Sequence, residues 1–110
     1  MAIPHAQPGE VVDVRPYAGT LSGQQTRTLV RASRLQVIRL VLPAGHEIPS
    51  HSAPDEMTVQ CLEGKVAFTT MGQTIDLTAG SLLYLQAGEP HALRATQPSS
   101  LLVTLVVHPR

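Results

Sequence analysis

Four glycines follow one another at a constant interval of eight residues, at Gly64, Gly72, Gly80 and Gly88. Glycine adopts backbone angles that other residues avoid, so it often marks the tight corners between strands. The segments between these glycines, 65–70, 74–77 and 82–85, each have the length of a short strand. This spacing predicts consecutive antiparallel strands joined by tight turns, and no helical stripe of useful length accompanies it.

Short apolar runs predict further strands at 10–14, 26–31, 35–42, 57–62, 91–95 and 101–107. The run at 10–14 alternates only weakly. Both faces of 35–42 are mostly apolar, so we expect one face to meet the core and the other to meet a partner subunit. Eight to ten short strands that are close in sequence predict an all-β fold, either an antiparallel sandwich or a barrel. We expect residues 1–10 to form a loose N-terminal arm and residues 11–110 to form a single domain.

The balance of charge excludes some partners and favours another. Eight Lys and Arg residues balance eight Asp and Glu residues, whereas a protein that binds nucleic acid normally has a basic surface. We therefore expect no nucleic-acid partner. Zero net charge also gives little repulsion between copies, and this favours a homodimer.

The expected location is the cytoplasm. No apolar stretch of about 18 residues is present, so we expect no membrane span. Cys61 is the single cysteine, which excludes an internal disulfide and agrees with a reducing compartment. The first residues lack the basic start and apolar run of a signal peptide.

Two histidines lie inside segments that are framed by glycine. The first segment runs from Gly45 through His51 to Gly64, and the second runs from Gly80 through Gly88 to His91. A histidine just after a corner between strands can point into the mouth of a barrel, where its imidazole can bind a metal ion.

The two segments resemble the two sequence motifs of the cupin family. Gly45, His51 and Gly64 fall in register with the first motif. Gly80, Gly88 and His91 fall in register with the second. The resemblance covers residues 45–95 and implies a cupin-like double-stranded β-barrel, which is a sandwich of the jelly-roll type. It also implies a metal site built from several histidines and a glutamate.

The chain departs from these motifs at the ligand positions themselves. Ala53 stands where the family has its second histidine, and Met57 stands where the family has its metal-binding glutamate. Gln86 replaces a proline and Ala95 replaces an asparagine. Of the usual four ligands, the resemblance therefore leaves only His51 and His91.

A divalent ion such as zinc, nickel, iron or manganese generally takes three or more protein ligands. Gln60 is our candidate for the third ligand, since its amide oxygen can bind a metal ion. In a regular strand Gln60 points away from the side of Met57, and only a bulge or a polar lumen would turn it inward. Glu56 is a better ligand chemically but comes one residue early, and His46 is more typical of a surface or structural histidine.

Three functions remain open on the sequence alone. The first is a small-molecule protein that depends on a divalent metal, an oxygenase or isomerase for example, with His51, His91 and Gln60 or water as ligands. The second is a metal-free module that holds a small ligand in an apolar lumen. The third is a structural or interaction domain. No phosphate-binding loop is present, so we expect no nucleotide cofactor, and we assign no enzymatic activity.

Overall fold

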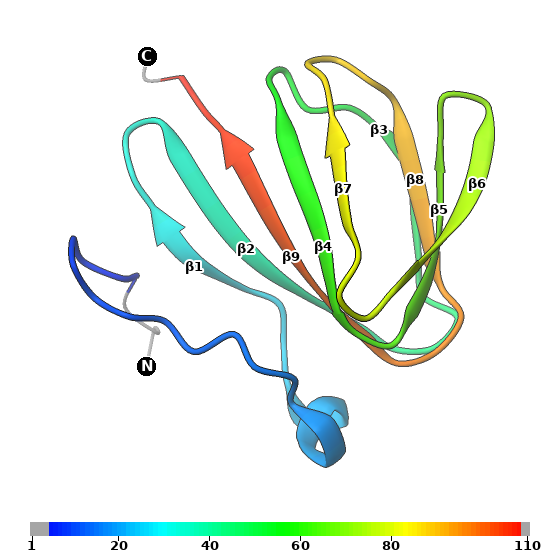
Figure 1. Ribbon diagram of the computed structural model, residues 1–110, viewed down its shortest axis with the longest axis horizontal. Coiled ribbons are helices and arrows are strands. Elements are labelled where there is room, and N and C mark those ends of the chain that lie inside the picture. The colour runs from blue at the N-terminus through cyan, green and yellow to red at the C-terminus, as the bar shows by residue number, and fades with distance from the viewer. Residues whose placement is uncertain (1–4, 109–110) are drawn as a thin grey trace.

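The computed structural model describes residues 5–108. Their regular elements are one 3-10 helix, η1, and nine strands (Figure 1). The bounds are η1 Ala18–Gly23, β1 Arg27–Arg31, β2 Leu35–Leu42, β3 Glu47–His51, β4 Met57–Glu63, β5 Lys65–Thr70, β6 Gln73–Thr78, β7 Leu82–Leu85, β8 His91–Ala95 and β9 Ser99–Val106. The all-β prediction is confirmed. Within the described residues, no helix is long and apolar enough to cross a membrane.

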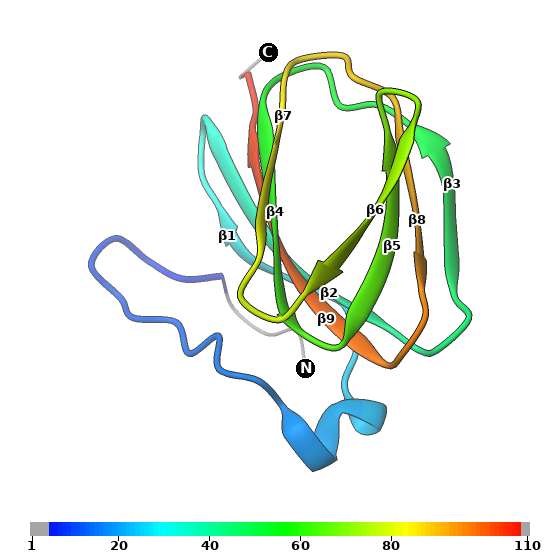
Figure 2. The ribbon, with the colours of Figure 1, turned by 45° about the vertical axis from the view of Figure 1, so that its right-hand side comes forward.

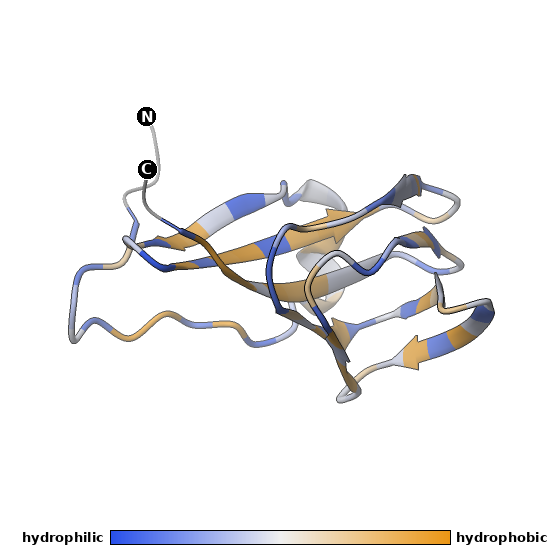
Figure 3. Cartoon of the chain, turned by 90° about the horizontal axis from the view of Figure 1, so that it is seen from above, coloured by the Kyte–Doolittle hydropathy of each residue, from blue (hydrophilic) through white to orange (hydrophobic). Residues whose placement is uncertain are grey.

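The strands form two antiparallel sheets that face each other (Figure 2). The larger sheet has the order β1-β2-β9-β4-β7, and the smaller has the order β3-β8-β5-β6. Neighbouring strands are often distant in sequence, because β9 lies between β2 and β4. Seen from above, the two sheets form separate layers whose strands carry most of the apolar residues (Figure 3).

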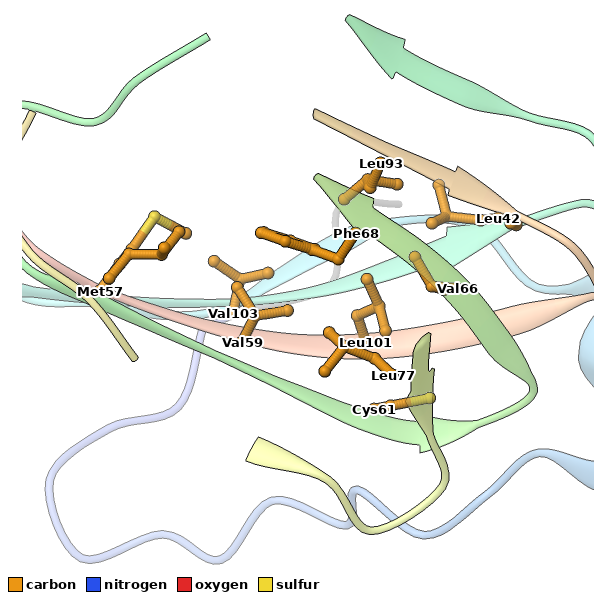
Figure 4. Packing of buried hydrophobic residues seen from close by; sticks show 12 residues of the cluster. Leu42, Met57, Val59, Cys61, Val66, Phe68, Leu77, Leu93, Leu101 and Val103 are labelled. Atoms are coloured by element: carbon orange, nitrogen blue, oxygen red, sulfur yellow. The ribbon is translucent and has the colours of Figure 1, made fainter. Parts of the chain in front are cut away.

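Alternation along each strand decides which side chains fill the space between the sheets. In β4, Met57, Val59 and Cys61 are buried, whereas the residues between them are only partly buried. The same alternation holds in β5, where Val66 and Phe68 are fully buried. These side chains meet in one core cluster (Figure 4). Its buried members are Leu42, Met57, Val59, Cys61, Val66, Phe68, Leu77, Leu85, Leu93, Ala95, Leu101 and Val103.

The predicted turns at the four regularly spaced glycines are confirmed. Gly64, Gly72, Gly80 and Gly88 all have positive φ angles, and each lies in the connection between two successive strands. Gly64 is the most restricted of these, because a Cβ atom there would lie 2.3 Å from the carbonyl oxygen of Pro98. Only glycine allows the backbone of 64 to approach the start of β9 this closely.

One expected strand is absent, and one observed strand is not predicted by the sequence. Residues 10–14 have no strand structure; their weak alternation is not matched by any neighbouring strand with which they could pair. Conversely, β3 was not predicted, because Pro49 interrupts it. Proline cannot donate a ladder hydrogen bond, but β3 is an edge strand and has a bulge at this point, so Pro49 is tolerated.

The N-terminal segment packs against the outer face of the larger sheet. Residues 5–17 have no regular secondary structure, and the first four residues of the expected arm lie outside the described residues. The ring of Tyr17 lies 3.7 Å from the guanidinium carbon of Arg39, which is 2% exposed. Arg39 also donates hydrogen bonds to the Arg15 carbonyl and to the carboxylate of Glu63. These contacts bury a charged residue on a face that would otherwise be open to solvent.

Candidate functional site

A cavity of about 250 Å³ lies between the two sheets at the end where β3 ends and β4 and β8 begin. The residues that line it are Ile38, Leu40, Ile48, His51, Ala53, Met57, Val59, Phe68, His91, Leu93, Val103 and Leu105. Apart from the two histidines, all of these lining residues are apolar. The loops 52–56 and 86–90 meet at this end, where the N–H of Gly88 donates a hydrogen bond of 2.9 Å to the Ala53 carbonyl.

His51 and His91 face each other across the pair of strands β3 and β8. They are direct partners in the antiparallel register, and their ring centroids lie 4.3 Å apart in an edge-to-face arrangement. His91 is 3% exposed, whereas His51 is exposed at the mouth. On its other side, the ring of His91 stacks nearly parallel to Phe68, with centroids 5.6 Å apart. The sequence prediction that these two histidines share the barrel mouth is therefore matched by their positions.

A β-bulge turns His51 toward the cavity. Ile48 pairs with Leu93 and His51 pairs with His91, so three steps along β3 correspond to two steps along β8. In a regular strand, residues three positions apart point to opposite faces. The extra residue of the bulge restores the phase, so both Ile48 and His51 line the cavity.

The two imidazoles have the same hydrogen bond to the backbone. His51 Nδ1 lies 3.0 Å from the Pro49 carbonyl oxygen, and His91 Nδ1 lies 3.0 Å from the Glu89 carbonyl oxygen. A carbonyl oxygen can only accept, so each Nδ1 must donate its proton. In the neutral rings, each Nε2 atom is therefore left with a lone pair, which can accept a hydrogen bond or bind a metal ion.

The other candidate ligands lie elsewhere. Gln60 pairs with Leu82 and Leu102 in the larger sheet and is not among the residues that line the cavity. The bulge of β4 falls between Cys61 and Glu63, beyond Gln60, so it does not turn this amide inward. The structure thus brings two of the three proposed ligands together and separates the third from them.

Glu56 and His46 also lie outside the cavity wall. The carboxylate of Glu56 accepts a hydrogen bond of 2.7 Å from the hydroxyl of Tyr84, and this contact raises the pKa of Tyr84. Cys61 is buried at the far end of the core, and burial raises the pKa of its thiol. A buried thiol of this kind acts as a small apolar side chain.

The cavity offers fewer potential metal ligands than the motifs imply. Within residues 5–108, no three His, Cys, Asp or Glu side chains are grouped so that they could hold a metal ion. Two imidazoles fall short of the three or more protein ligands that a divalent ion generally takes. A divalent ion at this point would need water or a bound ligand to complete its coordination.

A larger depression, of about 810 Å³, lies on the outside of the barrel between residues 5–17 and β1. Its lining mixes basic and acidic side chains, such as Arg15, Arg27 and Asp13. These charges partly neutralise one another, since Arg15 and Asp13 form an ion pair of 3.1 Å. We regard the smaller cavity as the candidate site, because it is the one that joins an apolar wall to convergent polar atoms.

Comparison with known proteins agrees with this architecture. The family model described as "Cupin domain" matches residues 38–108. No curated protein matches the chain. A conserved protein of unknown function from Streptococcus pyogenes has 29% sequence identity to it and a TM-score of 0.73, over 100% of this chain and 97% of that one.

Two further solved structures are similar. An RmlC-like cupin protein from Desulfovibrio desulfuricans has 24% identity and a TM-score of 0.73, over 88% of this chain and 96% of that one. A cupin superfamily protein from Desulfitobacterium hafniense has 18% identity and a TM-score of 0.76, over 93% of this chain and 99% of that one. At these identities the likeness supports the fold, and the fold alone does not define an activity.

Proposed function

The chain belongs to the cupin family, and from this premise we propose that its barrel mouth binds a small, mostly apolar molecule whose polar group faces His51 and His91. The observation that carries the proposal is the wall of the cavity, which is apolar except for these two imidazoles. Binding sites for small molecules typically combine an apolar lining with a few placed polar groups.

The replaced ligand positions support the same function. Ala53 and Met57 both line the cavity, so the residues that stand in place of a histidine and a glutamate make it more apolar. A charged ligand that entered this cavity would lose its hydration water and meet no side chain of opposite charge, which has a high cost in free energy. A neutral molecule with one hydroxyl group would bury its apolar part and donate a hydrogen bond to Nε2 of an imidazole.

The volume limits the size of the ligand. A protein cavity of ~150 Å³ holds benzene, so about 250 Å³ suits a single ring with one or two substituents. Phenol is therefore a suitable probe. At about 0.7 kcal/mol for each of its seven non-hydrogen atoms, its dissociation constant would be roughly 0.3 mM.

The proposal is tested by calorimetric titration with phenol and with benzene. We expect phenol to bind about two- to twelvefold more tightly than benzene, which corresponds to one hydrogen bond of about 0.5–1.5 kcal/mol. The substitution His51→Leu should remove this preference, and His46→Leu, which lies outside the cavity wall, should leave it unchanged. Equal affinity for phenol and benzene in the unmodified protein would contradict the proposed role of the imidazoles.

A second pair of variants tests the cavity itself. Ala53→Phe should fill the mouth and weaken the binding of both probes. Ala92→Phe makes the same change on β8 next to His91, at a position outside the cavity lining. If Ala53→Phe remained folded and bound phenol as tightly as the unmodified protein, the proposed location would be wrong.

A metal ion at the imidazole pair is the second candidate function. The observation that favours it is the matched hydrogen bonding of both Nδ1 atoms, which leaves both Nε2 atoms free to bind a metal ion. Such backbone contacts commonly fix the orientation of histidines that bind metals. Elemental analysis after purification without chelator tests this candidate; less than a tenth of an equivalent, with and without added metal, would exclude it.

A further inference from the structure

Two arginines lie opposite each other on the outer face of the larger sheet. Arg27 in β1 and Arg39 in β2 are direct partners in the antiparallel register, so their side chains leave the sheet on the same face. Like charges placed directly opposite each other in a sheet repel. The ring of Tyr17 lies against both, with its centroid 3.7 Å from the guanidinium carbon of Arg39 and 5.9 Å from that of Arg27.

In the described part of the chain, only one of the two guanidinium groups has a carboxylate partner. Glu63 forms an ion pair of 3.2 Å with Arg39, whereas no carboxylate in residues 5–108 lies within ion-pair distance of Arg27. Arg39 is 2% exposed, and its Nε atom has no hydrogen-bond partner among the same residues. The two arginines and Glu63 therefore leave one positive charge uncompensated, at a place where solvent screens it only in part.

Hydrogen-bond donors for an anion lie together beside this charge. Nη2 of Arg27 donates hydrogen bonds to the hydroxyl of Tyr17, at 2.8 Å, and to Oε1 of Gln24, at 3.4 Å. The N–H groups on Nε and Nη1 of Arg27 have no acceptor in residues 5–108, and neither has the hydroxyl proton of Tyr17. A planar guanidinium binds a carboxylate through two parallel hydrogen bonds, and the phenolic O–H can supply a third.

The surroundings of Arg27 and Tyr17 restrict the charge of a ligand. Both residues line the outer depression of about 810 Å³ beside β1 (Figures 1 and 2). The carboxylate of Asp13 is already paired with Arg15. Glu10 also lines the depression, and its charge would repel a dianion more strongly than a monoanion. The depression also has apolar lining residues, which suit a ligand with an apolar body: Ala6, Val11, Val12, Pro16 and Leu29.

We propose that this depression binds a monocarboxylate with an apolar body, held by the guanidinium of Arg27 and the hydroxyl of Tyr17. The apolar part of the ligand lies against Leu29 and the N-terminal segment. Arg39, behind the Tyr17 ring, adds positive potential without touching the ligand. The depression shares no lining residue with the cavity between the sheets, so this site goes beyond the function proposed for the barrel mouth.

Methyl NMR at low ionic strength tests this site with benzoate and benzamide, two probes of similar shape of which only benzoate is charged. We expect benzoate to shift the signals of Val11 and Leu29 with a dissociation constant on the order of 1 mM. The signals of Ile48 and Val103 in the barrel mouth should stay unchanged. Benzamide should bind at the depression about tenfold more weakly than benzoate.

Two results of this titration would overturn the proposal. The first is the absence of any shift of Val11 and Leu29 at about 20 mM benzoate, which is well above the expected dissociation constant. The second is equal affinity of the depression for benzoate and benzamide, because the site would then not recognise the negative charge.

Substitution of Arg27 tests the guanidinium. Arg27→Gln should weaken benzoate binding about tenfold or more, and it should leave the protein folded because it also relieves the repulsion with Arg39. Arg31→Gln is the matched control, since it makes the same change on the same strand at an exposed residue outside the depression; its affinity for benzoate should be unchanged. Equal affinity in Arg27→Gln and the unmodified protein would exclude Arg27 as the anion-binding group.

Substitution of Tyr17 tests the hydroxyl separately from the ring. Tyr17→Phe keeps the ring beside Arg39 and removes one hydrogen-bond donor, so benzoate should bind about two- to twelvefold more weakly. Its affinity for phenol, which binds in the barrel mouth, should not change. A Tyr17→Phe variant that bound benzoate as tightly as the unmodified protein would contradict the role assigned to the hydroxyl.

Discussion

Ile48 and His51 line the same cavity although three positions separate them in strand β3. The bulge between them supplies the residue that brings both side chains to one face. Ile48 pairs with Leu93 and His51 pairs with His91. Deletion of Ser50 alone would leave two steps between these pairs along β3 and two along β8. We therefore expect the imidazoles to stay paired and the preference for phenol over benzene to persist.

Deletion of both Pro49 and Ser50 would put His51 out of phase with Ile48. We expect that variant to bind phenol and benzene equally, with circular dichroism confirming that it is folded. A preference for phenol in the double deletion, or its loss in the single deletion, would contradict the role assigned to the bulge.

The hydrogen bonds to the backbone predict one tautomer for both histidines of the site. Because His51 and His91 each donate Nδ1–H to a carbonyl oxygen, their neutral rings should have the proton on Nδ1 and the lone pair on Nε2. Long-range ¹H–¹⁵N spectra at alkaline pH measure this directly. The tautomer with the proton on Nε2, which is the more common form of a free imidazole in water, would show that these contacts are not formed in solution.

Much of the fold could be predicted because glycine and apolar spacing act locally. The corners at Gly64, Gly72, Gly80 and Gly88 need positive φ angles, and a single residue type reveals them. The alternation of β4 likewise identifies Met57, Val59 and Cys61 as core residues. Both signals can be detected within a few residues of sequence.

Features that depend on distant partners could not be predicted in this way. Strand β3 contains a proline, and only its pairing with β8 and its place at the sheet edge show that it is a strand. The Arg39 and Glu63 pair joins residues that are 24 positions apart. The two apolar residues beside Arg39 suggest a strand with one buried face. No local pattern, however, indicates that Arg39 itself is buried.

The carboxylate of Glu63 should make stability depend on pH in acid. Burial raises the pKa of this group, but hydrogen bonds from Ser100 and from the backbone of Tyr17 and Ala18, with the charge of Arg39, outweigh burial and lower the pKa below its ordinary value. Glu63 therefore binds a proton more readily in the unfolded chain than in the folded protein. The stabilisation of the fold by the ionised Glu63 is present above the ordinary pKa of this group, and it is lost as the pH falls through the lower pKa of the folded state.

Urea unfolding at several pH values checks this expectation with Glu63→Gln. At neutral pH the substitution should lower the free energy of unfolding by about 3 kcal/mol, because it leaves Arg39 buried without its partner. The difference between the two proteins should shrink as the pH falls below the ordinary pKa of a glutamate, 4.5. The control Asp76→Asn removes an exposed ion pair with Lys65 and should cost less than about 1 kcal/mol. A constant difference at every pH would refute the assignment.

We also propose that the chain forms a homodimer through the outer face of the larger sheet. The register and the alternation of the strands place Leu35, Leu82, Tyr84 and Val106 on this face, where all four are exposed. Light scattering should give a mass of two chains at micromolar concentration. Leu82→Lys should shift the mass toward one chain, whereas Val11→Lys, on the N-terminal segment, should not. A mass of one chain for the unmodified protein would remove the proposal.

The binding of a small molecule between the two sheets is tested most directly by methyl NMR during a titration with phenol. We expect the methyl signals of Ile48, Leu93 and Val103, which line the cavity, to shift together with one dissociation constant. The signals of Val11 and Leu29, which line the outer depression, should not move. Shifts confined to Val11 and Leu29, with the cavity methyl groups unchanged, would contradict a binding site in the barrel mouth.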